Sequence, residues 1–333
     1  MDATTKAPAP TPGGNPLSEP HEPHWVSRAA FPIMAGLLAL NLGALFAALY
    51  HNNYWLAVPL VLTACHLMHG NLIGFHEASH GMLRKSRFLN DLDGVFIGFL
   101  SLMSFTLYRA AHQTHHAHLG CERDEELWPF NDPKSPRWFR CLMAFTELCF
   151  GLFHTPGMFL RTFLRKDSPI RSKKVRRRVW MELFGIVAFH AALLTVAVGL
   201  TGTWKYWLWM YFIPGFIAGN LQSWRKYVEH VGLTGSTIRS ATRSIIANTW
   251  SGKLVSFTLL HEPFHGVHHQ RAGLPHAELP IYQKDLYPTN EEELEPFRSY
   301  SHAIGHLLGC LRDPKVGAQW RGLKGAPAAL AAE

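Results

Sequence analysis

Three short clusters of histidines stand out in the sequence, and their spacing could hold metal ions. The first cluster spans residues 76–80 (HEASH), the second 112–116 (HQTHH) and the third 265–269 (HGVHH). Because residues four apart share one face of a helix, the first and last histidine of a cluster can point at one centre. Histidine is the commonest metal ligand among side chains, and this chain has 21 of them in 333 residues.

The number of these histidines indicates how many metal ions they could serve. One tetrahedral zinc site has room for about four ligands, so the cluster histidines suit two ions. Imidazole nitrogens favour iron, zinc, copper or nickel, and iron is the one whose common role in such sites is oxygen chemistry. The predicted ligands are His76, His80, His112, His115, His116, His265, His268 and His269, with His230, just past the last apolar stretch, as a further candidate.

Acidic residues near the clusters could accept hydrogen bonds from the ring N–H groups and so fix which nitrogen faces a metal. Glu262 is one such candidate. We expect this role for Glu77 and Glu229, each next to a candidate ligand. For Glu122 and Asp124, a solvated loop is an equally good interpretation.

Two other kinds of metal site remain open alternatives. Residues 76–80 and 261–265 both match the HExxH pattern of zinc proteases. That interpretation leaves HQTHH and HGVHH without a role, and Pro263 would break or kink the second helix. A metal-binding or transport protein is the other alternative. A transporter should place polar residues near the mid-bilayer, whereas most of the candidate ligands here follow the ends of apolar stretches.

Apolar stretches separate the histidine clusters and must position them. Only 17% of the residues are charged, against about 25% in a typical soluble domain. A helix needs about 20 apolar residues to cross the hydrocarbon core. Two further stretches, Leu92–Leu107 and Cys141–Leu160, are predicted to be interfacial or re-entrant helices. The predicted membrane spans are Ala29–Tyr50, Tyr54–Phe75, Val179–Leu200 and Trp204–Leu221.

The distribution of basic residues predicts the orientation of these spans. Four spans form two hairpins, so both termini and the long middle loop share one side. That side carries the run Lys173–Arg178 and the pair Arg225 and Lys226, whereas the opposite turns hold only Lys205. The positive-inside rule therefore places the termini and the histidine clusters in the cytoplasm. Topology also accounts for the net charge of +8, and no nucleic-acid partner is predicted.

The fold class predicted from these features is an all-α integral membrane protein. Its four transmembrane helices form two hairpins, with interfacial helices and a cytoplasmic, histidine-rich cap that holds two metal ions. Residues 1–24 are rich in Pro, Ala, Thr and Gly without periodicity, which predicts a disordered N-terminal tail. Residues 25–312 form the membrane domain, and residues 313–333 are predicted to be a second disordered tail.

Taken together, the motifs resemble those of the membrane fatty acid desaturase superfamily. The order HxxxH, HxxHH and HxxHH, with paired apolar spans between the boxes, extends from Tyr54 to Tyr282. The segment 229–234 (EHVGLT) is similar to the EHxG element of that family. Pro275 and Pro280 match its proline-marked segment after the last histidines.

The resemblance implies a non-haem di-iron centre bound by the candidate histidines. Two iron ions would use O₂ as co-substrate and two electrons to introduce a double bond into an acyl chain of a membrane lipid. The tail 1–24 is too short for a fused cytochrome b5 domain, so we expect a separate electron donor, either a ferredoxin or a cytochrome b5. We expect the protein to lie in a bacterial inner membrane.

Two positions depart from the pattern of similar proteins. His261 stands where an asparagine is often found, and Gln270-Arg271-Ala272 replaces an apolar residue, an aromatic residue and a proline. Both departures adjoin the predicted site, where they bear on the substrate and on the outcome of the reaction. Similar proteins also hydroxylate alkanes or lipids, or add keto groups to carotenoids, and these outcomes stay open as the alternative.

Overall fold

Helices build the molecule. The computed structural model describes residues 23–200 and 202–321, and among them the only β-type pairing is one isolated bridge between Ile245 and Phe297. Short π-helical or 3-10 segments are η1 (Thr195–Leu200), η2 (Leu208–Phe212), η3 (Arg239–Ala241), η4 (His276–Leu286) and η5 (Ala318–Trp320). The α-helices are α1 (Trp25–Arg28), α2 (Ala30–Tyr50), α3 (Tyr54–His80), α4 (Arg87–Leu100), α5 (Phe105–Ala117), α6 (Arg137–Leu164), α7 (Lys173–Leu194), α8 (Trp204–Trp207), α9 (Ile213–His230), α10 (Trp250–Thr258), α11 (His265–Gln270) and α12 (Tyr300–Cys310).

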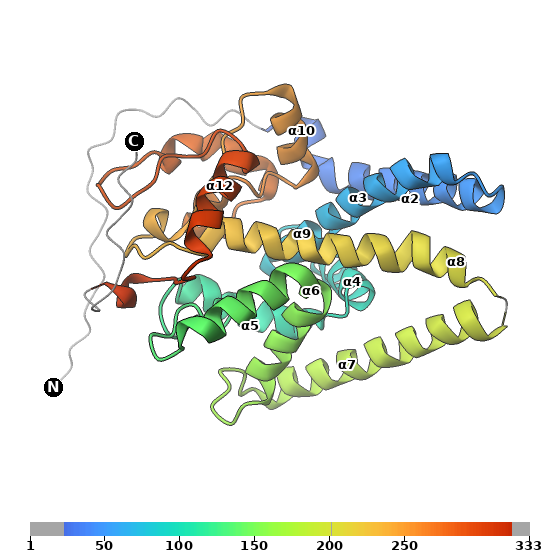
Figure 1. Cartoon of the computed structure of the whole chain (residues 1–333), viewed down its shortest axis with the longest axis horizontal. Helices are drawn as coiled ribbons and strands as arrows, with labels where there is room; N and C mark the ends of the chain where they lie inside the picture. The colour runs from blue at the N-terminus through green and yellow to red at the C-terminus, as the bar shows by residue number, and fades with distance from the viewer. Residues whose placement is uncertain (1–22, 201, 322–333) are drawn as a thin grey trace.

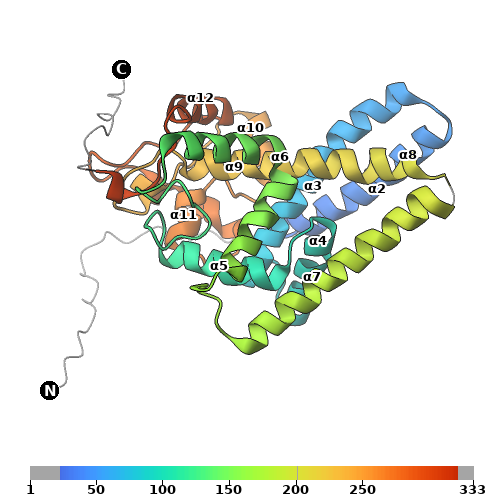
Figure 2. The ribbon, with the colours of Figure 1, turned by 60° about the horizontal axis from the view of Figure 1, so that its bottom comes forward.

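The long helices form one part of the molecule, and the short C-terminal helices form a cap at one end of it (Figure 1). Helices α2 and α3 make a hairpin, and α3 also packs against α9. The α2–α3 turn and α8 lie at the end far from α12 in Figure 1, and Figure 2 shows the same separation, with α11 and α12 in the cap. The two hairpins expected from the sequence therefore point away from the cap.

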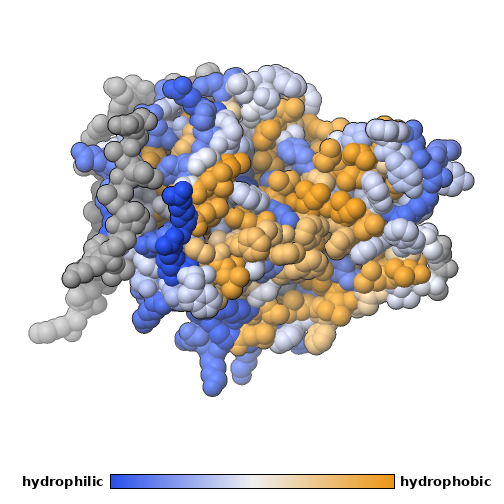
Figure 3. Space-filling model, viewed as in Figure 1, coloured by the Kyte–Doolittle hydropathy of each residue, from blue (hydrophilic) through white to orange (hydrophobic). Residues whose placement is uncertain are grey.

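Apolar side chains cover the outside of the long helices. Trp55 and Leu62 on α3 are largely exposed, as are Phe184 and Val187 on α7. Figure 3 shows hydrophobic residues gathered over the long helices, with hydrophilic residues over the cap. Large exposed apolar surfaces mark contacts with membranes or partners, and this arrangement is the one that lipid-facing helices require.

Three helices in the described residues are long and apolar enough to cross a membrane: Ala30–Tyr50, Tyr54–His80 and Lys173–Gly199. The fourth predicted span, Trp204–Leu221, is helical but divided among α8, η2 and α9, and it is not one of the three. Helices α4 and α5 together are also long and apolar enough to cross a membrane, but a bend of 103° separates them at a short break. This break interrupts the predicted Leu92–Leu107 stretch, and the number of spans stays a prediction.

A buried carboxylate fixes the start of α5, which carries the second histidine cluster. Glu182, on α7, accepts hydrogen bonds from the hydroxyl of Ser104 at 2.7 Å and from both the backbone N–H and the hydroxyl of Thr106, at 2.9 and 2.6 Å. The Ser104 hydroxyl also caps α5 by accepting from the N–H of Leu107. Glu182, the one acidic residue in the third predicted span, thereby ties α5 to α7.

Helix α6 contains the predicted Cys141–Leu160 stretch and is kinked at Phe150, whose φ and ψ of −133° and 35° are not helical. Asn220 of α9 satisfies the backbone groups that the kink frees. Its side-chain oxygen accepts from the N–H of Gly151 at 2.7 Å, and its amide donates to the carbonyl of Cys149 at 2.9 Å. A side chain at Gly219 would collide with Leu152, so glycine permits the close crossing of α6 and α9.

The predicted C-terminal tail begins too early. Residues 313–321 pack onto the cap, where Val316 and Trp320 are buried. The indole N–H of Trp320 donates to the carbonyl of Phe130 at 2.8 Å, and Arg140 donates to the carbonyl of Pro314 at 2.9 Å. Composition alone suggested a tail, but one aromatic anchor and a buried arginine hold this segment in place. Residues 1–22 and 322–333 of the two predicted tails lie outside the described residues.

Candidate metal centre

The nine predicted ligands lie together where α3, α5 and α9 meet α11 of the cap, so they come from four different helices. His76 and His80 end α3, His230 ends α9, and the others lie on α5 and α11. Cluster A is defined as His76, His80, His112, His116 and His268, which offer nitrogen atoms within 4.8 Å of one another. Cluster B is defined as His115, His230 and His269, which do the same, together with His265, whose Nε2 lies 2.9 and 3.0 Å from those of His230 and His269.

Two nitrogens of cluster B face each other with no proton between them. His230 donates from Nδ1 to the carbonyl of Ala241 at 3.1 Å, and His265 donates from Nδ1 to Glu262 at 2.9 Å. Burial lowers the pKa of His265 to about 4, so this ring is neutral at pH 7. A neutral imidazole has one N–H, so both Nε2 atoms present lone pairs, 2.9 Å apart. Facing lone pairs repel, and a bound cation would resolve this contact.

In cluster A, the His112 ring is held in the same tautomer. His112 donates from Nδ1 to Glu126 at 2.8 Å, which leaves its Nε2 without a proton. That Nε2 lies 3.0 Å from Nε2 of His80 and 3.1 Å from Nε2 of His116. The Nε2 of His116 in turn lies 3.1 Å from that of His268. The donor set is therefore all-imidazole, as iron, zinc, copper and nickel favour.

The two clusters adjoin each other. The rings of His116 in cluster A and His269 in cluster B stack, with centroids 4.3 Å apart and planes 19° from parallel. Burial and the neighbouring histidines hold the pKa of both His268 and His269 well below the usual range. Neutral rings are the form that binds metals, and the grouped nitrogen atoms of the two clusters fit two neighbouring metal ions.

Three carboxylates accept hydrogen bonds from predicted ligand rings: Asp124 and Glu262, both among the predicted candidates, and Glu126, which was not. Asp124 accepts from Nδ1 of His115 at 2.8 Å, and Glu126 and Glu262 do the same for His112 and His265. Glu77 comes no closer than 3.8 Å to His76 Nδ1, and Glu229 is instead hydrogen-bonded to Arg225. Neither accepts a hydrogen bond from a predicted ligand.

Asp124 lies in a loop but is buried, so it does not take the solvated position that its sequence context allows. Glu126 is an orienting residue that the sequence motifs do not single out. The segment 124–126 (DEE) follows the second histidine cluster by eight residues. That proximity was the available signal, because a short loop can return acidic side chains to the ligands that precede it. Asn131 holds this loop by donating to the carbonyls of Cys121 and Asp124, both at 2.7 Å.

A left-handed turn delivers Glu262. The backbone φ angles of Leu260 and His261 are +49° and +56°, a region that costs of order 1 kcal/mol or more per residue for residues with a Cβ. Two backbone hydrogen bonds hold the turn. The N–H of His261 donates to the carbonyl of Ser256 at 2.7 Å, and the N–H of Glu262 donates to the carbonyl of Leu259 at 2.9 Å. The turn therefore aims Glu262 into the cap.

The zinc-protease alternative is not supported by this turn. Its second HExxH match requires His261 and His265 on one helix. His261 instead precedes α11, and its backbone has a left-handed conformation. His261 stacks instead on His276, with ring centroids 6.1 Å apart, and belongs to neither cluster.

Arg225 and Lys226, two of the basic residues that underlie the predicted orientation of the spans, are both largely buried. Nη1 of Arg225 donates to both oxygens of Glu229 at 2.6 Å and to Glu262 at 2.7 Å. Burial would raise the pKa of Glu262, but His76 and Arg225 hold it well below its usual range. These two basic residues therefore serve the interior of the cap rather than the membrane surface.

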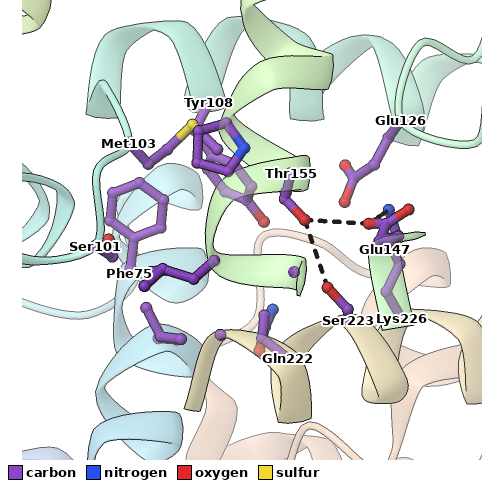
Figure 4. A pocket seen from close by; sticks show the side chains of 15 residues that line it. Phe75, Ser101, Met103, Tyr108, Glu126, Glu147, Thr155, Gln222, Ser223 and Lys226 are labelled. Carbon is purple, nitrogen blue, oxygen red and sulfur yellow. Dashed lines mark hydrogen bonds and ion pairs between the residues drawn. The ribbon is translucent and has the colours of Figure 1, made fainter. Parts of the chain in front are cut away.

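A cavity of about 70 Å³ lies beside cluster A. Figure 4 shows Phe75 and Met103 on one side of it, with Thr155, Ser223 and Lys226 on the other. The Tyr108 ring, also in its wall, stacks on His112 with centroids 5.1 Å apart. Glu126 lines the cavity as well, so the space reaches a residue that contacts the predicted ligand His112.

A larger and mainly apolar cavity of about 840 Å³ lies among the long helices. Helices α2, α3, α4, α7 and α9 all contribute to its walls. Leu72, Ser101 and Leu152 line both cavities, so these three residues form the boundary between them. The larger volume falls within the roughly 300–1,000 Å³ typical of small-molecule sites.

Comparison with known proteins places the chain in a family. A sequence model described as "Fatty acid desaturase" matches residues 53–301, most of the chain and all three histidine clusters. The chain therefore belongs to the fatty acid desaturase family.

Curated relatives carry desaturase names. The chain is 28% identical over 204 residues to an sn-1 oleoyl-lipid 12-desaturase of Synechocystis sp., covering 57% of this chain and 55% of that protein. It is 26% identical to an sn-1 acyl-lipid omega-3 desaturase (ferredoxin) of Nostoc sp., over 52% of this chain and 49% of the relative. A delta(12) fatty acid desaturase of Calendula officinalis is 22% identical, over 67% of this chain and 62% of that protein. The chain spans about half to three fifths of the length of these relatives.

Proposed function

We propose that this protein is a membrane-bound, O₂-dependent desaturase that introduces a double bond into an acyl chain of a lipid through a di-iron centre. The observation that carries the proposal is the convergence of nine histidines in two adjoining clusters, one of which brings the unprotonated Nε2 atoms of His230 and His265 to 2.9 Å from each other. Family membership adds the reaction class. The ligands would be His76, His80, His112, His116 and His268 for one ion, and His115, His230, His265 and His269 for the other.

The reaction balances without any further co-substrate. Two hydrogens leave neighbouring carbons of the acyl chain, and one O₂, two electrons and two protons are consumed to give two waters. When bound, the iron ions would supply the oxidising power for this C–H cleavage. The chain's own task is to hold the ions, orient the ligand rings through Asp124, Glu126 and Glu262, and keep bulk water away from the site.

The cavities supply a route for the substrate. In this proposal, an acyl chain lies in the apolar cavity among the long helices and passes Leu72, Ser101 and Leu152 toward cluster A. The apolar side of the small cavity, with Phe75 and Met103, would hold the carbons that react. Holding a substrate close to the reacting centre supplies much of the selectivity of such a reaction.

The electron donor is a separate protein in this proposal. Two electrons must reach the cap for each double bond, and relatives from Nostoc and Synechocystis carry "ferredoxin" in their names. We assign a ferredoxin-type donor on the cytoplasmic side, where the positive-inside rule places the cap and both termini. The membrane in this proposal is a bacterial inner membrane.

Metal content paired with lipid analysis tests the proposal. The full-length protein is purified in detergent for iron and zinc determination, and the lipids of cells expressing it are compared with those of cells expressing His112→Ala. We expect about two irons per chain and a new unsaturated acyl chain only with the unchanged protein. An oxygenated product with two irons would move the assignment to a hydroxylase or ketolase. One zinc with unchanged lipids would reject the proposal.

A further inference from the structure

Glu262 lies between the two histidine clusters and contacts a ligand of each. Its Oε1 accepts from Nδ1 of His265 in cluster B at 2.9 Å. Its Oε2 lies 3.4 Å from Nδ1 of His76 in cluster A, and in the described part of the chain neither of these two buried atoms has another hydrogen-bond partner. If His76 held a metal through Nε2, its Nδ1–H would be left as a donor that faces Oε2 of Glu262.

A buried arginine fixes the position of this carboxylate. Nη1 of Arg225 donates to Oε1 of Glu262 and to both oxygens of Glu229, and all three residues are buried. The left-handed turn at Leu260 and His261 sets the backbone of Glu262 from the other side. Because charge-assisted hydrogen bonds are short and directional, the two oxygens of Glu262 have little freedom to leave His76 and His265.

The other two orienting carboxylates each serve a single cluster. Asp124 contacts His115 of cluster B at 2.8 Å, and Glu126 contacts His112 of cluster A at the same distance. The remaining bonds of Asp124 go to backbone N–H groups of Gly120 and Glu126. Glu262 thus differs from both, because it alone among these three carboxylates touches a ligand from each cluster.

From this difference we propose that Glu262, held by Arg225, is a positioning residue shared by both metal sites. Its loss weakens binding of both ions, whereas loss of Glu126 or Asp124 weakens binding of one. The inference rests on the proposed function only for the presence of two metal ions. An outer-sphere hydrogen bond typically contributes about 10–100-fold to metal affinity, and Glu262 contributes that factor at each site.

The test is a competition titration of the full-length, metal-free protein in detergent with Fe²⁺ against a chelator, without O₂. The unchanged protein should bind two ions. Glu262→Gln should lower the affinity for both by about 10–100-fold. Glu126→Gln and Asp124→Asn should each lower the affinity for one ion and leave the other at its original value. If Glu262→Gln keeps one ion at the original affinity, the proposal is overturned.

Two further variants guard against a merely structural effect. Glu147→Gln removes another buried carboxylate, one that pairs with Lys226 and Tyr227 and touches no histidine of either cluster. It should bind two ions as the unchanged protein does, and a loss of both ions in this variant also overturns the proposal. If Glu262→Gln is not obtained folded, Arg225→Lys gives the readout, because it keeps the charge but removes the planar donor that positions Glu262. That variant should lower the affinity for both ions, and a lowered affinity for one ion alone overturns the proposal.

The titration separates this inference from the proposed function. A protein that binds no iron rejects both. If the unchanged protein binds two irons but Glu262→Gln lowers the affinity for one alone, the shared role of Glu262 is rejected and the desaturase assignment stays intact.

Discussion

The carboxylate of Glu182 on α7 holds Thr106 on α5 by two hydrogen bonds, one to the backbone N–H at 2.9 Å and one to the hydroxyl at 2.6 Å. These two residues are 76 positions apart in the sequence. The contact joins α7 to the first turn of α5, the helix that carries His112, His115 and His116. The position of three predicted ligands therefore depends on a residue in a predicted membrane span.

Replacement of Glu182 by alanine should destabilise the protein by at least about 2 kcal/mol, because the carboxylate accepts three hydrogen bonds and a single bond to a charged group already contributes about 1.5–3 kcal/mol. The thermal midpoint in detergent and the iron content should both fall. Arg178→Ala is the matched control, since Arg178 is half exposed and pairs with the same carboxylate at 3.1 Å. A surface pair of this kind contributes about 0–1 kcal/mol. Equal loss in the two variants would contradict the role of Glu182.

Replacement of His112 or His268 by alanine should abolish activity and lower the iron content, while the protein still inserts into the membrane. Both rings contribute nitrogen atoms to cluster A. His302→Ala is the control, because His302 is exposed at the start of α12 and its ring is hydrogen-bonded to the hydroxyl of Ser299, away from both clusters. Full activity in the His112 and His268 variants would refute their assignment as ligands.

Substitution at the boundary between the two cavities should block the substrate without disturbing the metal. Leu72→Trp places a large ring where both cavities meet, so we expect activity to fall at least tenfold with two irons retained. Leu62→Trp, on the lipid-facing surface of the same helix, should leave activity unchanged. Iron content and lipid composition are measured together, and unchanged activity in Leu72→Trp would show that the chain takes another route.

Acidification from pH 7 to pH 5 should destabilise the metal-free protein. Burial lowers the pKa of His261 to about 4 and that of His276 to about 3, against about 6.5 in an unfolded chain. Below about pH 6.5 the unfolded chain binds protons that the folded chain does not, so the free energy of unfolding falls as the pH falls. The check is the thermal midpoint with chelator present. His261→Gln should flatten the dependence, and a midpoint that rises on acidification would contradict it.

Trp320→Ala should destabilise the cap by about 3–5 kcal/mol, the usual cost of truncating a buried large aromatic side chain. Trp320 is 6% exposed and donates to the carbonyl of Phe130. Trp250→Ala, where the side chain is 78% exposed, should have little effect on stability. Thermal unfolding of the two variants decides whether residues 313–321 stabilise the domain, and equal midpoints would show that they do not.

Periodicity and spacing were enough to predict the helical character and the nine clustered histidines. In a membrane, a long apolar run such as Ala30–Tyr50 is stable mainly as a helix, because its backbone N–H and C=O groups must pair within the segment. The HxxxH spacing brings His76 and His80 together on one helix face through local geometry alone. Each of these properties depends on residues close together in the sequence.

Tertiary structure decided which residues support the histidines. Asp124, Glu126 and Glu262 reach His115, His112 and His265 through loop and turn geometry, whereas Glu77, which adjoins a ligand in sequence, does not. The burial of Arg225 beside Glu229 and Glu262 likewise depends on the packing of α9 against the cap. Hydrogen-bond partners of a buried charge are fixed by the folded arrangement of distant segments, and no local pattern specifies that arrangement.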